Sequence, residues 1–525
     1  MAINYNKFNI IHIFLISLFP VLFIYSQNID ETPVQEIVLP ALLILFGAVL
    51  LWLLTRFIIK NNEKSAFIIS LLLVLSFSYG HIYLLVDDFT LGDSDLGRHR
   101  YLLIPFVISF VVGTYYFVKT KVDLNNMSTI FNVFAASVLV IILINVATYN
   151  LENIDSFENE VIAPPSVSLF DTTIETISSY HVESKSHPDV YYIILDAYTS
   201  SNSLNKFLNY DNYEFVSYLT DKGFTVNHNS YSNYPSSLPS ITSTFNMMYL
   251  NSLTDGQIGP QKLHISEKMI SEGPVMQNFK SAGYDIIILH RPFTEMSSSS
   301  LFDLELCKRN QYIDSQLLSL IIRTSVLGFA LEKSQEQEMR ETALCNFSEL
   351  PKQHKAFDKP IFVVSHILIP HPPYLFDPDG NPVDSIRPQG LEDWDYKEGY
   401  INSVKFANKK IIQVVDELLT DSENPPAIII QADHGSQFDF DSNNPSNENI
   451  EQVMSNFSAY YLPDIEKYSS NDVITPVNTF RIIFNSYFNT DYDLLENKMY
   501  WINPAGTSDD APEYFIDVTD ILITP

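Results

Sequence analysis

The sequence PAIIIQADHG, at residues 426–435, decides the fold. Three consecutive isoleucines, with prolines before them and a glycine after, predict a strand buried on both faces, as in a parallel sheet. The strand ends in Asp433 and His434, a carboxylate beside an imidazole. Because ligands bind beyond the carboxyl ends of strands in open α/β sheets, this pair is a candidate metal site. The same residues could also form an ordinary Asx turn.

A second apolar run, at 190–195, ends in the same way at Asp196. Further strands are predicted at 284–289, 361–365 and 457–462, and an amphipathic helix at 399–419. Strands that alternate with helices indicate an α/β fold with a mainly parallel sheet covered on both faces, an α/β/α sandwich. Asp196, Asp433 and His434 would then be three metal ligands at one edge of this sheet.

The charge of the chain narrows the choice of partners. The 525 residues carry 31 Lys and Arg against 62 Asp and Glu, a formal net charge of -31. Nucleic acid is bound largely through Lys and Arg contacts to phosphate, so no nucleic-acid partner is expected.

Five apolar stretches fill residues 1–150, at 8–26, 37–54, 65–86, 101–118 and 128–148. Each is about as long as a helix that crosses a bilayer, so we predict a five-helix transmembrane anchor in contact with the lipid bilayer. The basic residues of the short loops set the orientation. One side would carry Lys7, Arg56, Lys60, Lys64, Lys119 and Lys121, and the other only Arg98 and Arg100. This predicts a multi-pass protein of the cell membrane with a cytoplasmic N-terminus and the rest of the chain outside the cytoplasm.

Residues 151–187 have the acidic and then Ser/Pro-rich composition of a linker, here extracytoplasmic. A catalytic domain is expected at 188–525, with a helical insertion at 302–357 where no clear strand is predicted. The two cysteines, Cys307 and Cys345, could form a disulfide in an oxidising compartment, but the sequence does not show that they are close.

A loop of small hydroxyl residues at 233–243, NYPSSLPSITS, leads into a predicted helix. Unpaired backbone N–H groups at a helix start favour an anion. A metal held by Asp196, Asp433 and His434 could lower the pKa of one of these hydroxyls and make it a nucleophile. One of the serines could instead only cap the helix.

Two histidines, His366 and His371, follow the strand at 361–365 in the sequence HILIPHPPY. His371 is a candidate for donating to a substrate oxyanion or protonating a leaving group. His366, and Asn233 at the start of the hydroxyl loop, are further candidates for substrate binding. A single histidine is more often structural, and two at one strand end make a functional role more plausible.

The order of these motifs resembles the alkaline phosphatase superfamily, above all its sulfatase-like membrane enzymes, such as lipoteichoic acid synthases and lipid A phosphoethanolamine transferases. The resemblance covers residues 188–465, and the anchor matches in layout. It implies that Asp196, Asp433 and His434 bind the metal. It also implies that Ser237 is the nucleophile and a further metal ligand, and that His371 contacts substrate.

Three features depart from the sulfatase pattern. Ser-Leu-Pro-Ser at 237–240 matches the start of the formylglycine signature, but Ile241 takes the place of its arginine. Asp196 is followed by Ala197 rather than by a second aspartate, and no histidine follows His434. These departures favour an enzyme with one metal ion and an unmodified Ser237.

We therefore expect a membrane-anchored metalloenzyme that cleaves or transfers phosphate or sulfate esters of cell-envelope lipids or glycans. Its cofactor would be one divalent metal ion, with Zn or Mn favoured by the mixed oxygen and nitrogen ligands and Mg or Ca less favoured. Two alternatives remain open. One is a formylglycine-type sulfatase, and the other is a non-catalytic envelope protein that retains the fold.

Overall fold

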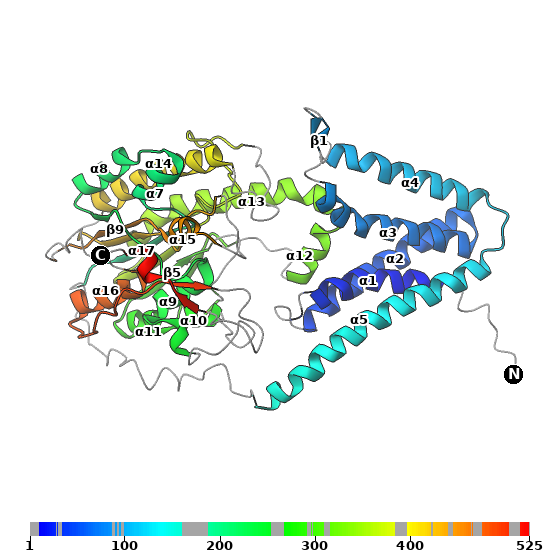
Figure 1. Ribbon diagram of the computed structural model, residues 1–525, viewed down its shortest axis with the longest axis horizontal. Helices are drawn as coiled ribbons and strands as arrows, with labels where there is room; N and C mark the ends of the chain where they lie inside the picture. Colours follow the sequence, from blue (N-terminus) through cyan, green and yellow to red (C-terminus); the bar gives the residue numbers. More distant parts are fainter. Residues whose placement is uncertain are drawn as a thin grey trace. The chain divides into compact units, whose positions relative to one another are not determined.

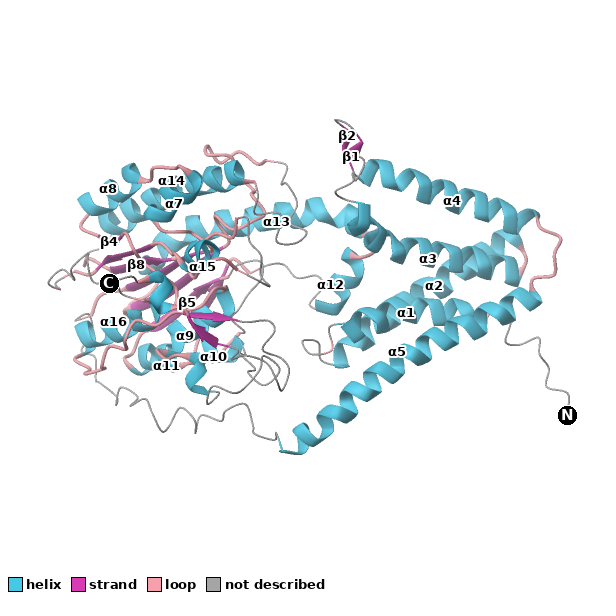
Figure 2. Cartoon of the chain, viewed as in Figure 1, coloured by secondary structure: helices cyan, strands magenta, loops and turns pink. Residues whose placement is uncertain are grey.

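The five predicted strands, joined by β4 and β6, which were not predicted, form a seven-stranded sheet in the computed structural model, in the order β4-β9-β8-β3-β7-β5-β6 (Figures 1 and 2). Its strands are β3 (Val190–Leu195), β4 (Thr225–Asn227), β5 (Asp285–Leu289), β6 (Leu304–Leu306), β7 (Ile361–Ile367), β8 (Ala427–Gln431) and β9 (Ser458–Tyr461). The strands β8, β3, β7, β5 and β6 run parallel, whereas at one edge β9 pairs antiparallel with β8 and β4 pairs antiparallel with β9. The mainly parallel sheet is therefore confirmed.

The structure describes residues 10–523 with several gaps. The residues outside the description are 1–9, 28, 30–33, 87–89, 92–93, 96–98, 160–186, 254–266, 291–295, 297, 309–315, 384–395, 422–423, 439–444, 464, 466–474, 503–514 and 524–525. Lys7, Arg98 and most of the predicted linker lie outside the described residues. By their internal contacts the residues divide into two units, 1–166 with 310–335 and 167–309 with 336–525.

Helices cover both faces of the sheet, as expected for strands that are buried throughout (Figure 2). The first face packs against α7 (Ser201–Leu208), α8 (Tyr213–Asp221), α13 (Gly328–Glu349) and α14 (Lys397–Asp421). The second face packs against α9 (Ser237–Asn246), α10 (Glu267–Ser271), α11 (Pro274–Ser281) and α16 (Thr479–Phe488). Each face has its own apolar core, so the sheet is the middle layer of an α/β/α sandwich.

A smaller apolar cluster joins the C-terminal segment to α15 (Asn447–Met454). It contains Trp501 of β10 (Tyr500–Ile502) and Leu522 of α17 (Thr519–Leu522). The strand β10 pairs antiparallel with β11 (Phe515–Asp517). Short 3-10 helices lie at Leu250–Leu253, Leu350–Lys355 and Pro476–Asn478.

The segment 302–357 differs from the prediction of a purely helical insertion. It contains α12 (Gln316–Arg323) and α13, but also β6, which pairs in parallel with β5. This strand has only three residues and is half-buried, so it lacks the apolar run that revealed the other parallel strands. Residues 310–335 also belong, by their contacts, with the N-terminal helices rather than with the sheet.

The N-terminal unit contains α1 (Ile11–Gln27), α2 (Val38–Ile59), α3 (Asn62–Val86), α4 (His99–Lys119) and α5 (Asn125–Asn159). A 3-10 helix at Val34–Ile37 precedes α2, and β1 (Thr90–Leu91) pairs with β2 (Ser94–Asp95) before α4. Among the described residues, four helices are long and apolar enough to cross a membrane, and α1 is shorter, with 17 residues.

Large apolar side chains point away from the protein on α2, α4 and α5. Phe46 is 70% exposed, and Val112 and Phe134 are 59% and 69% exposed. Exposed apolar faces of this extent are found where another hydrophobic phase covers them, which for helices of this length is the bilayer. α1 packs instead against α3 and α5, and its side chains Ile13 and Val21 are buried.

Candidate active site

The turn that follows β3 carries Asp196. Its next residue, Ala197, has a left-handed backbone with φ of 59°. The Ala197 N–H donates to Asp433 Oδ1 over 3.0 Å, and the Ala197 carbonyl accepts from the Tyr400 hydroxyl over 2.8 Å. The same hydroxyl accepts from the Thr199 N–H over 3.1 Å. Hydrogen bonds from two other parts of the chain therefore hold this turn and orient Asp196.

Asp433 and His434 follow β8, the neighbour of β3. Asp433 Oδ1 accepts a second hydrogen bond, from the His434 N–H over 3.0 Å. His434 Nδ1 lies 2.8 Å from the Gly435 carbonyl, so Nδ1 carries the proton and leaves Nε2 with a lone pair. A Cβ at Gly435 would lie 2.2 Å from the Ser455 carbonyl oxygen, which explains why glycine follows the histidine.

Strand register brings the two carboxylates together. Ile194 of β3 pairs with Gln431 of β8, and Asp196 and Asp433 each follow two residues later. Side chains alternate between the faces of a sheet, so both carboxylates leave on the same face as Ile194. That face is covered by α9, the helix that begins with Ser237.

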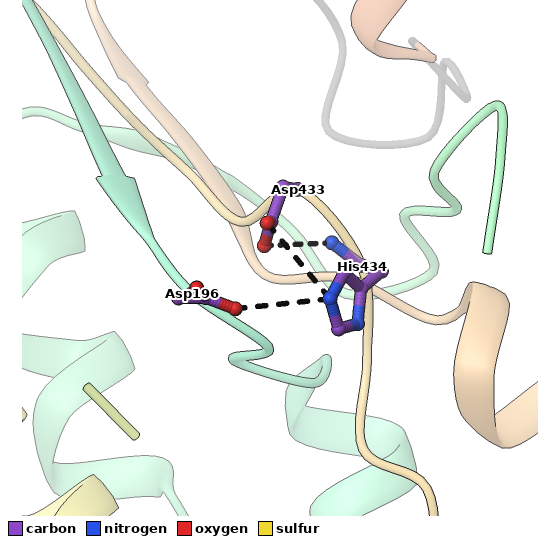
Figure 3. A group of neighbouring side chains, drawn as sticks. All are labelled: Asp196, Asp433 and His434. Carbon is purple, nitrogen blue, oxygen red and sulfur yellow. Dashed lines mark hydrogen bonds and ion pairs between the residues drawn. The ribbon is translucent and has the colours of Figure 1, made fainter. Parts of the chain in front are cut away.

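Asp196, Asp433 and His434 are buried, and one ligand atom from each lies within 4.8 Å of the others (Figure 3). His434 Nε2 lies 3.7 Å from Asp196 Oδ1 and 3.9 Å from Asp433 Oδ2. Asp433 Oδ2 accepts no hydrogen bond from any described residue. Two buried carboxylates beside an imidazole lone pair are a costly arrangement without a cation, and this mixed oxygen and nitrogen set suits a divalent metal ion. The residues therefore fit the predicted metal.

Ser237 is the first residue of α9, and its hydroxyl oxygen lies 3.5 Å from His434 Nε2. The residue is half-buried. Two other hydroxyls of the predicted loop are used within the fold, since Ser240 donates to the Asp433 carbonyl and Ser243 to the Met248 carbonyl. The structure thus singles out Ser237 as the serine of this helix start that lies beside the metal ligands.

The two predicted histidines lie at the same place. His366 is the sixth residue of β7, and its Nε2 lies 3.5 Å from Asp196 Oδ2 and 3.6 Å from Asp433 Oδ2. His371 donates its backbone N–H to the Asp196 carbonyl, and its ring centroid lies 6.4 Å from that of His434. His371 Nδ1 is 2.5 Å from the Pro372 carbonyl, so Nδ1 carries a proton.

Asn233 does not fit the predicted role in substrate binding. Its side chain is fully buried, with the amide nitrogen donating to the Lys498 carbonyl and the amide oxygen accepting from the Val477 N–H. Asn233 therefore joins the hydroxyl loop to the C-terminal part of the chain and offers no surface to a ligand. A loop asparagine that looks accessible in sequence is here bonded to backbone groups more than 240 residues away.

His290 was not predicted as a site residue, although it also follows a strand. Leu289 of β5 pairs with Ser365 of β7, so His290 lies level with His366 on the next strand. Its Nε2 lies 2.8 Å from Glu305 Oε2. Burial lowers the pKa of His290, although Glu305 opposes this shift. Ionisable residues thus follow or end four parallel strands, β3, β5, β7 and β8. Ligands bind beyond the carboxyl ends of such strands, and this rule, which predicted the residues at β3, β7 and β8, also applies to His290 after β5.

The chain was compared with known protein families, with curated protein sequences and with solved structures. The profile of the sulfatase family matches residues 188–480. No curated protein sequence matches the chain.

Several solved structures are similar to the chain. The integral membrane lipooligosaccharide phosphoethanolamine transferase EptA from Neisseria meningitidis is 11% identical, with 91% of this chain and 95% of that chain covered and a TM-score of 0.38. The C-terminal periplasmic domain of EptC from Escherichia coli is 15% identical, with coverage of 66% and 96% and a TM-score of 0.41. The lipoteichoic acid synthase LtaP from Listeria monocytogenes is 14% identical, with coverage of 65% and 76% and a TM-score of 0.34. At such identities the roles of individual residues rest on the geometry above.

Proposed function

The chain belongs to the sulfatase family, and from this premise we propose that it is a membrane-anchored, metal-dependent enzyme acting on phosphate or sulfate esters of cell-envelope lipids or glycans. The observation that carries the proposal is the meeting of four groups from distant parts of the chain. Asp196, Asp433 and His434 form a buried ligand set, and the hydroxyl oxygen of Ser237 lies 3.5 Å from His434 Nε2. A nucleophile beside a metal site is the arrangement that ester transfer requires.

Asp196, Asp433 and His434 would hold one divalent ion, with Zn or Mn favoured. When bound, such an ion lowers the pKa of a neighbouring hydroxyl and neutralises charge on the ester oxygens. Ser237 gives its hydroxyl proton to water, and its Oγ forms a bond to the phosphorus or sulfur of the ester while the bond to the leaving oxygen breaks with its electron pair on that oxygen. His371, protonated on both ring nitrogens, donates its Nε2 proton to the leaving oxygen and keeps its Nδ1 proton on the Pro372 carbonyl. Water or an acceptor hydroxyl later attacks the same phosphorus or sulfur and frees Ser237.

Ser237 and its neighbour Ser236 provide a matched test of the nucleophile. The full chain is incubated in detergent with 4-nitrophenyl phosphate, bis(4-nitrophenyl) phosphate or 4-nitrophenyl sulfate, with Zn or Mn present. We expect Ser237→Ala to lower kcat by roughly a thousandfold or more, and Ser236→Ala to retain most of it. Acid quenching followed by peptide mass spectrometry should show the transferred group on Ser237. Equal activity of the Ser237→Ala variant and the wild type would refute the proposed nucleophile.

The same peptide distinguishes the formylglycine alternative. Conversion of Ser237 to formylglycine removes two hydrogens, and the peptide would be lighter by that amount. The observation that supports an unmodified serine is Ile241, at the position of the signature's arginine. The non-catalytic alternative predicts instead that the purified chain binds no Zn or Mn and that Asp433→Ala changes nothing.

We also propose that the sheet-containing unit lies outside the cytoplasm, with the N-terminus inside. Two observations support this orientation. The basic residues of the short loops favour it, and Cys307 and Cys345 form a disulfide, which persists in oxidising compartments. Labelling of intact cells with a membrane-impermeant thiol reagent tests it, using single cysteines placed in the loops on a cysteine-free background. A label on the loop at 60–61 from outside the cell would reverse the orientation.

The anchor makes a membrane-borne substrate the class to test first. Vesicles that contain phosphatidylethanolamine or phosphatidylglycerol serve as donors, and release of the headgroup or its transfer to an added glycan is measured. Turnover of a vesicle lipid that depends on Ser237 would support a lipid substrate, whereas turnover of free sugar sulfates alone would favour a glycan sulfatase.

A further inference from the structure

A segment of the chain leaves the sheet-containing unit and returns to it. Residues 310–335 make their contacts within the unit of N-terminal helices, whereas the residues on both sides, up to 309 and from 336, belong to the sheet-containing unit. Within this excursion, α12 and the turn that follows it, residues 316–328, are here called the docking arm (Figure 1).

One face of α12 is buried against a membrane helix. Leu317 is 0% exposed and Ile321 2% exposed, and both share an apolar cluster with Val21, Ile24 and Tyr25 of α1. Residues four apart lie on the same side of a helix, so the two side chains form a single apolar contact face. This degree of burial is typical of a packed core rather than of a loop that touches the surface by chance.

Polar contacts fix both ends of the docking arm. At the start of α12, the Leu317 N–H donates to Glu36 Oε2 over 3.0 Å, so a carboxylate just before α2 pairs with an N–H that has no partner within α12. After α12, the Thr324 carbonyl accepts from the Gly80 N–H over 3.0 Å. The Val326 N–H donates to the Ser76 carbonyl over 2.9 Å.

The contact with α3 requires a glycine. In an α-helix an N–H group pairs with the carbonyl four residues earlier, as the Gly80 N–H would with the Ser76 carbonyl. Both of these backbone groups of α3 form hydrogen bonds with the docking arm. A Cβ at Gly80 would lie 2.5 Å from the Thr324 carbonyl oxygen and 2.6 Å from the Thr324 Cα. Backbone atoms cannot move aside as the end of a flexible side chain can, so any larger residue at position 80 must displace the arm.

The base of the excursion is closed within the other unit. Cys307 and Cys345 form a disulfide across 38 residues, which ties the outgoing chain to the returning helix α13. Asn346, next to Cys345, donates to the His290 carbonyl and accepts from Ser365. The docking arm is therefore the tip of a loop with both ends anchored in the sheet-containing unit.

We propose that the docking arm is a second attachment of the catalytic unit to the membrane helices, in addition to the linker that joins the end of α5, at Asn159, to β3. Its partner is the site formed by α1, Glu36 and the backbone of α3 around Gly80. The attachment holds the catalytic unit at the membrane even when the linker is cut. This inference concerns attachment and does not depend on which ester the enzyme acts on.

The test cuts the linker in the full chain. A recognition sequence for a site-specific protease is inserted between residues 160 and 186, the protein is cleaved in native membranes, and the membranes are washed with high salt. The fraction of the C-terminal fragment that sediments, and that co-purifies with the N-terminal fragment in mild detergent, is measured. Among the described residues, every candidate membrane span ends by Thr148, and α5, the helix that contains the last span, ends at Asn159, so the fragment contains no span. We expect the wild-type fragment to remain bound.

Two glycines of membrane helices form a matched pair for this assay. Gly80→Leu should lower the retained fraction roughly tenfold or more, because the loss of two backbone hydrogen bonds and of the close contact exceeds one tenfold step in binding. Gly47→Leu is the control, since a Cβ at Gly47 meets no atom within 4 Å. Leu317→Asp gives the same result from the side of the arm, without changing any membrane helix, should Gly80→Leu fail to insert.

Three results of this assay would overturn the proposal. Release of the wild-type fragment on cleavage overturns the proposal, as does equal retention of the Gly80→Leu and Gly47→Leu proteins. Leu327, which is 58% exposed in the turn after α12, tests whether the arm merely adsorbs to lipid. If Leu327→Asp releases the C-terminal fragment to the same extent as Leu317→Asp, the docking arm adsorbs to the bilayer and does not bind the membrane helices, which overturns the proposal.

Discussion

Tyr400 is expected to control metal affinity without touching the metal. Its hydroxyl donates to the Ala197 carbonyl over 2.8 Å and accepts from the Thr199 N–H over 3.1 Å, so it holds the turn that carries Asp196. Tyr400 is fully buried, and burial raises its pKa, so the hydroxyl keeps its proton and its donor role at any physiological pH. Tyr400→Phe removes both hydrogen bonds and leaves the ring in place.

The size of the effect follows from these two bonds. A neutral hydrogen bond contributes about 0.5–1.5 kcal/mol, so the two together contribute about 1–3 kcal/mol to the conformation of the turn. The Ala197 N–H also bonds to Asp433 Oδ1, so movement of the turn disturbs two of the metal ligands. Loss of groups that orient metal ligands typically weakens metal binding by roughly 10–100-fold. We therefore expect the Kd for Zn or Mn to rise by that factor in the Tyr400→Phe protein.

Tyr198→Phe is the matched control. Tyr198 is equally buried, and its hydroxyl donates to Asn408 over 2.6 Å and accepts from Asn212 over 3.0 Å, away from the turn backbone. Both variants should lose similar thermal stability, but only Tyr400→Phe should lose metal affinity, measured by competition with a chromogenic chelator on the full chain in detergent. An unchanged Kd for Tyr400→Phe, or an equal loss in Tyr198→Phe, would refute the positioning role.

Three further outcomes are expected of the sheet-containing unit. Removing the bound metal with a chelator should lower the melting temperature of the full chain in detergent, and restoring Zn or Mn should raise it in a concentration-dependent way, because the ion binds only the folded ligand set. Replacing Cys345 by serine breaks its disulfide with Cys307 and should lower the free energy of unfolding by up to about 4 kcal/mol for a 38-residue loop, measured by denaturant unfolding with and without reductant. Burial raises the pKa of Glu305, but hydrogen bonds from Lys308 and His290 outweigh it and bring the pKa below the ordinary 4.5. Glu305→Gln should therefore destabilise the protein above pH 4.5, and the difference from wild type should disappear as the pH falls through the lowered pKa; a difference that persists or grows in acid would contradict this assignment.

The buried parallel strands could be read from the sequence because their signal is local. The strand at 190–195 has the predicted bounds, and β8 lies within the stretch at 426–435 that predicted it, since each is a continuous apolar run that ends at a polar residue. Strand β6 was missed because three half-buried residues at a sheet edge carry neither an apolar run nor a clear alternation. The length and composition of an apolar run were thus sufficient to predict the fully buried strands, but not the half-buried strand β6 at the edge of the sheet.

The roles of individual polar residues were harder to predict, because they depend on partners far away in the chain. Asn233 and Ser237 lie in the same loop, and both looked accessible in sequence. The structure uses the amide of Asn233 to bond Val477 and Lys498, and leaves Ser237 beside His434. The docking arm was likewise unpredictable, since its contact with Gly80 is made by backbone atoms, which carry no pattern in the sequence.

The geometry of the metal site depends on the register of the strands β3, β7 and β8. Asp196 and Asp433 lie two residues beyond the paired Ile194 and Gln431, and His366 pairs with Ile194 on the other side. A slip of one residue in β8 would turn Asp433 to the opposite face of the sheet, toward the core that α14 covers, and would separate it from Asp196. The isoleucines of β8 oppose such a slip only weakly, because they are apolar on both faces and fit either core. The Ala197–Asp433 hydrogen bond and a shared metal ion each require the native register, so the catalytic groups also specify the pairing of the strands that carry them.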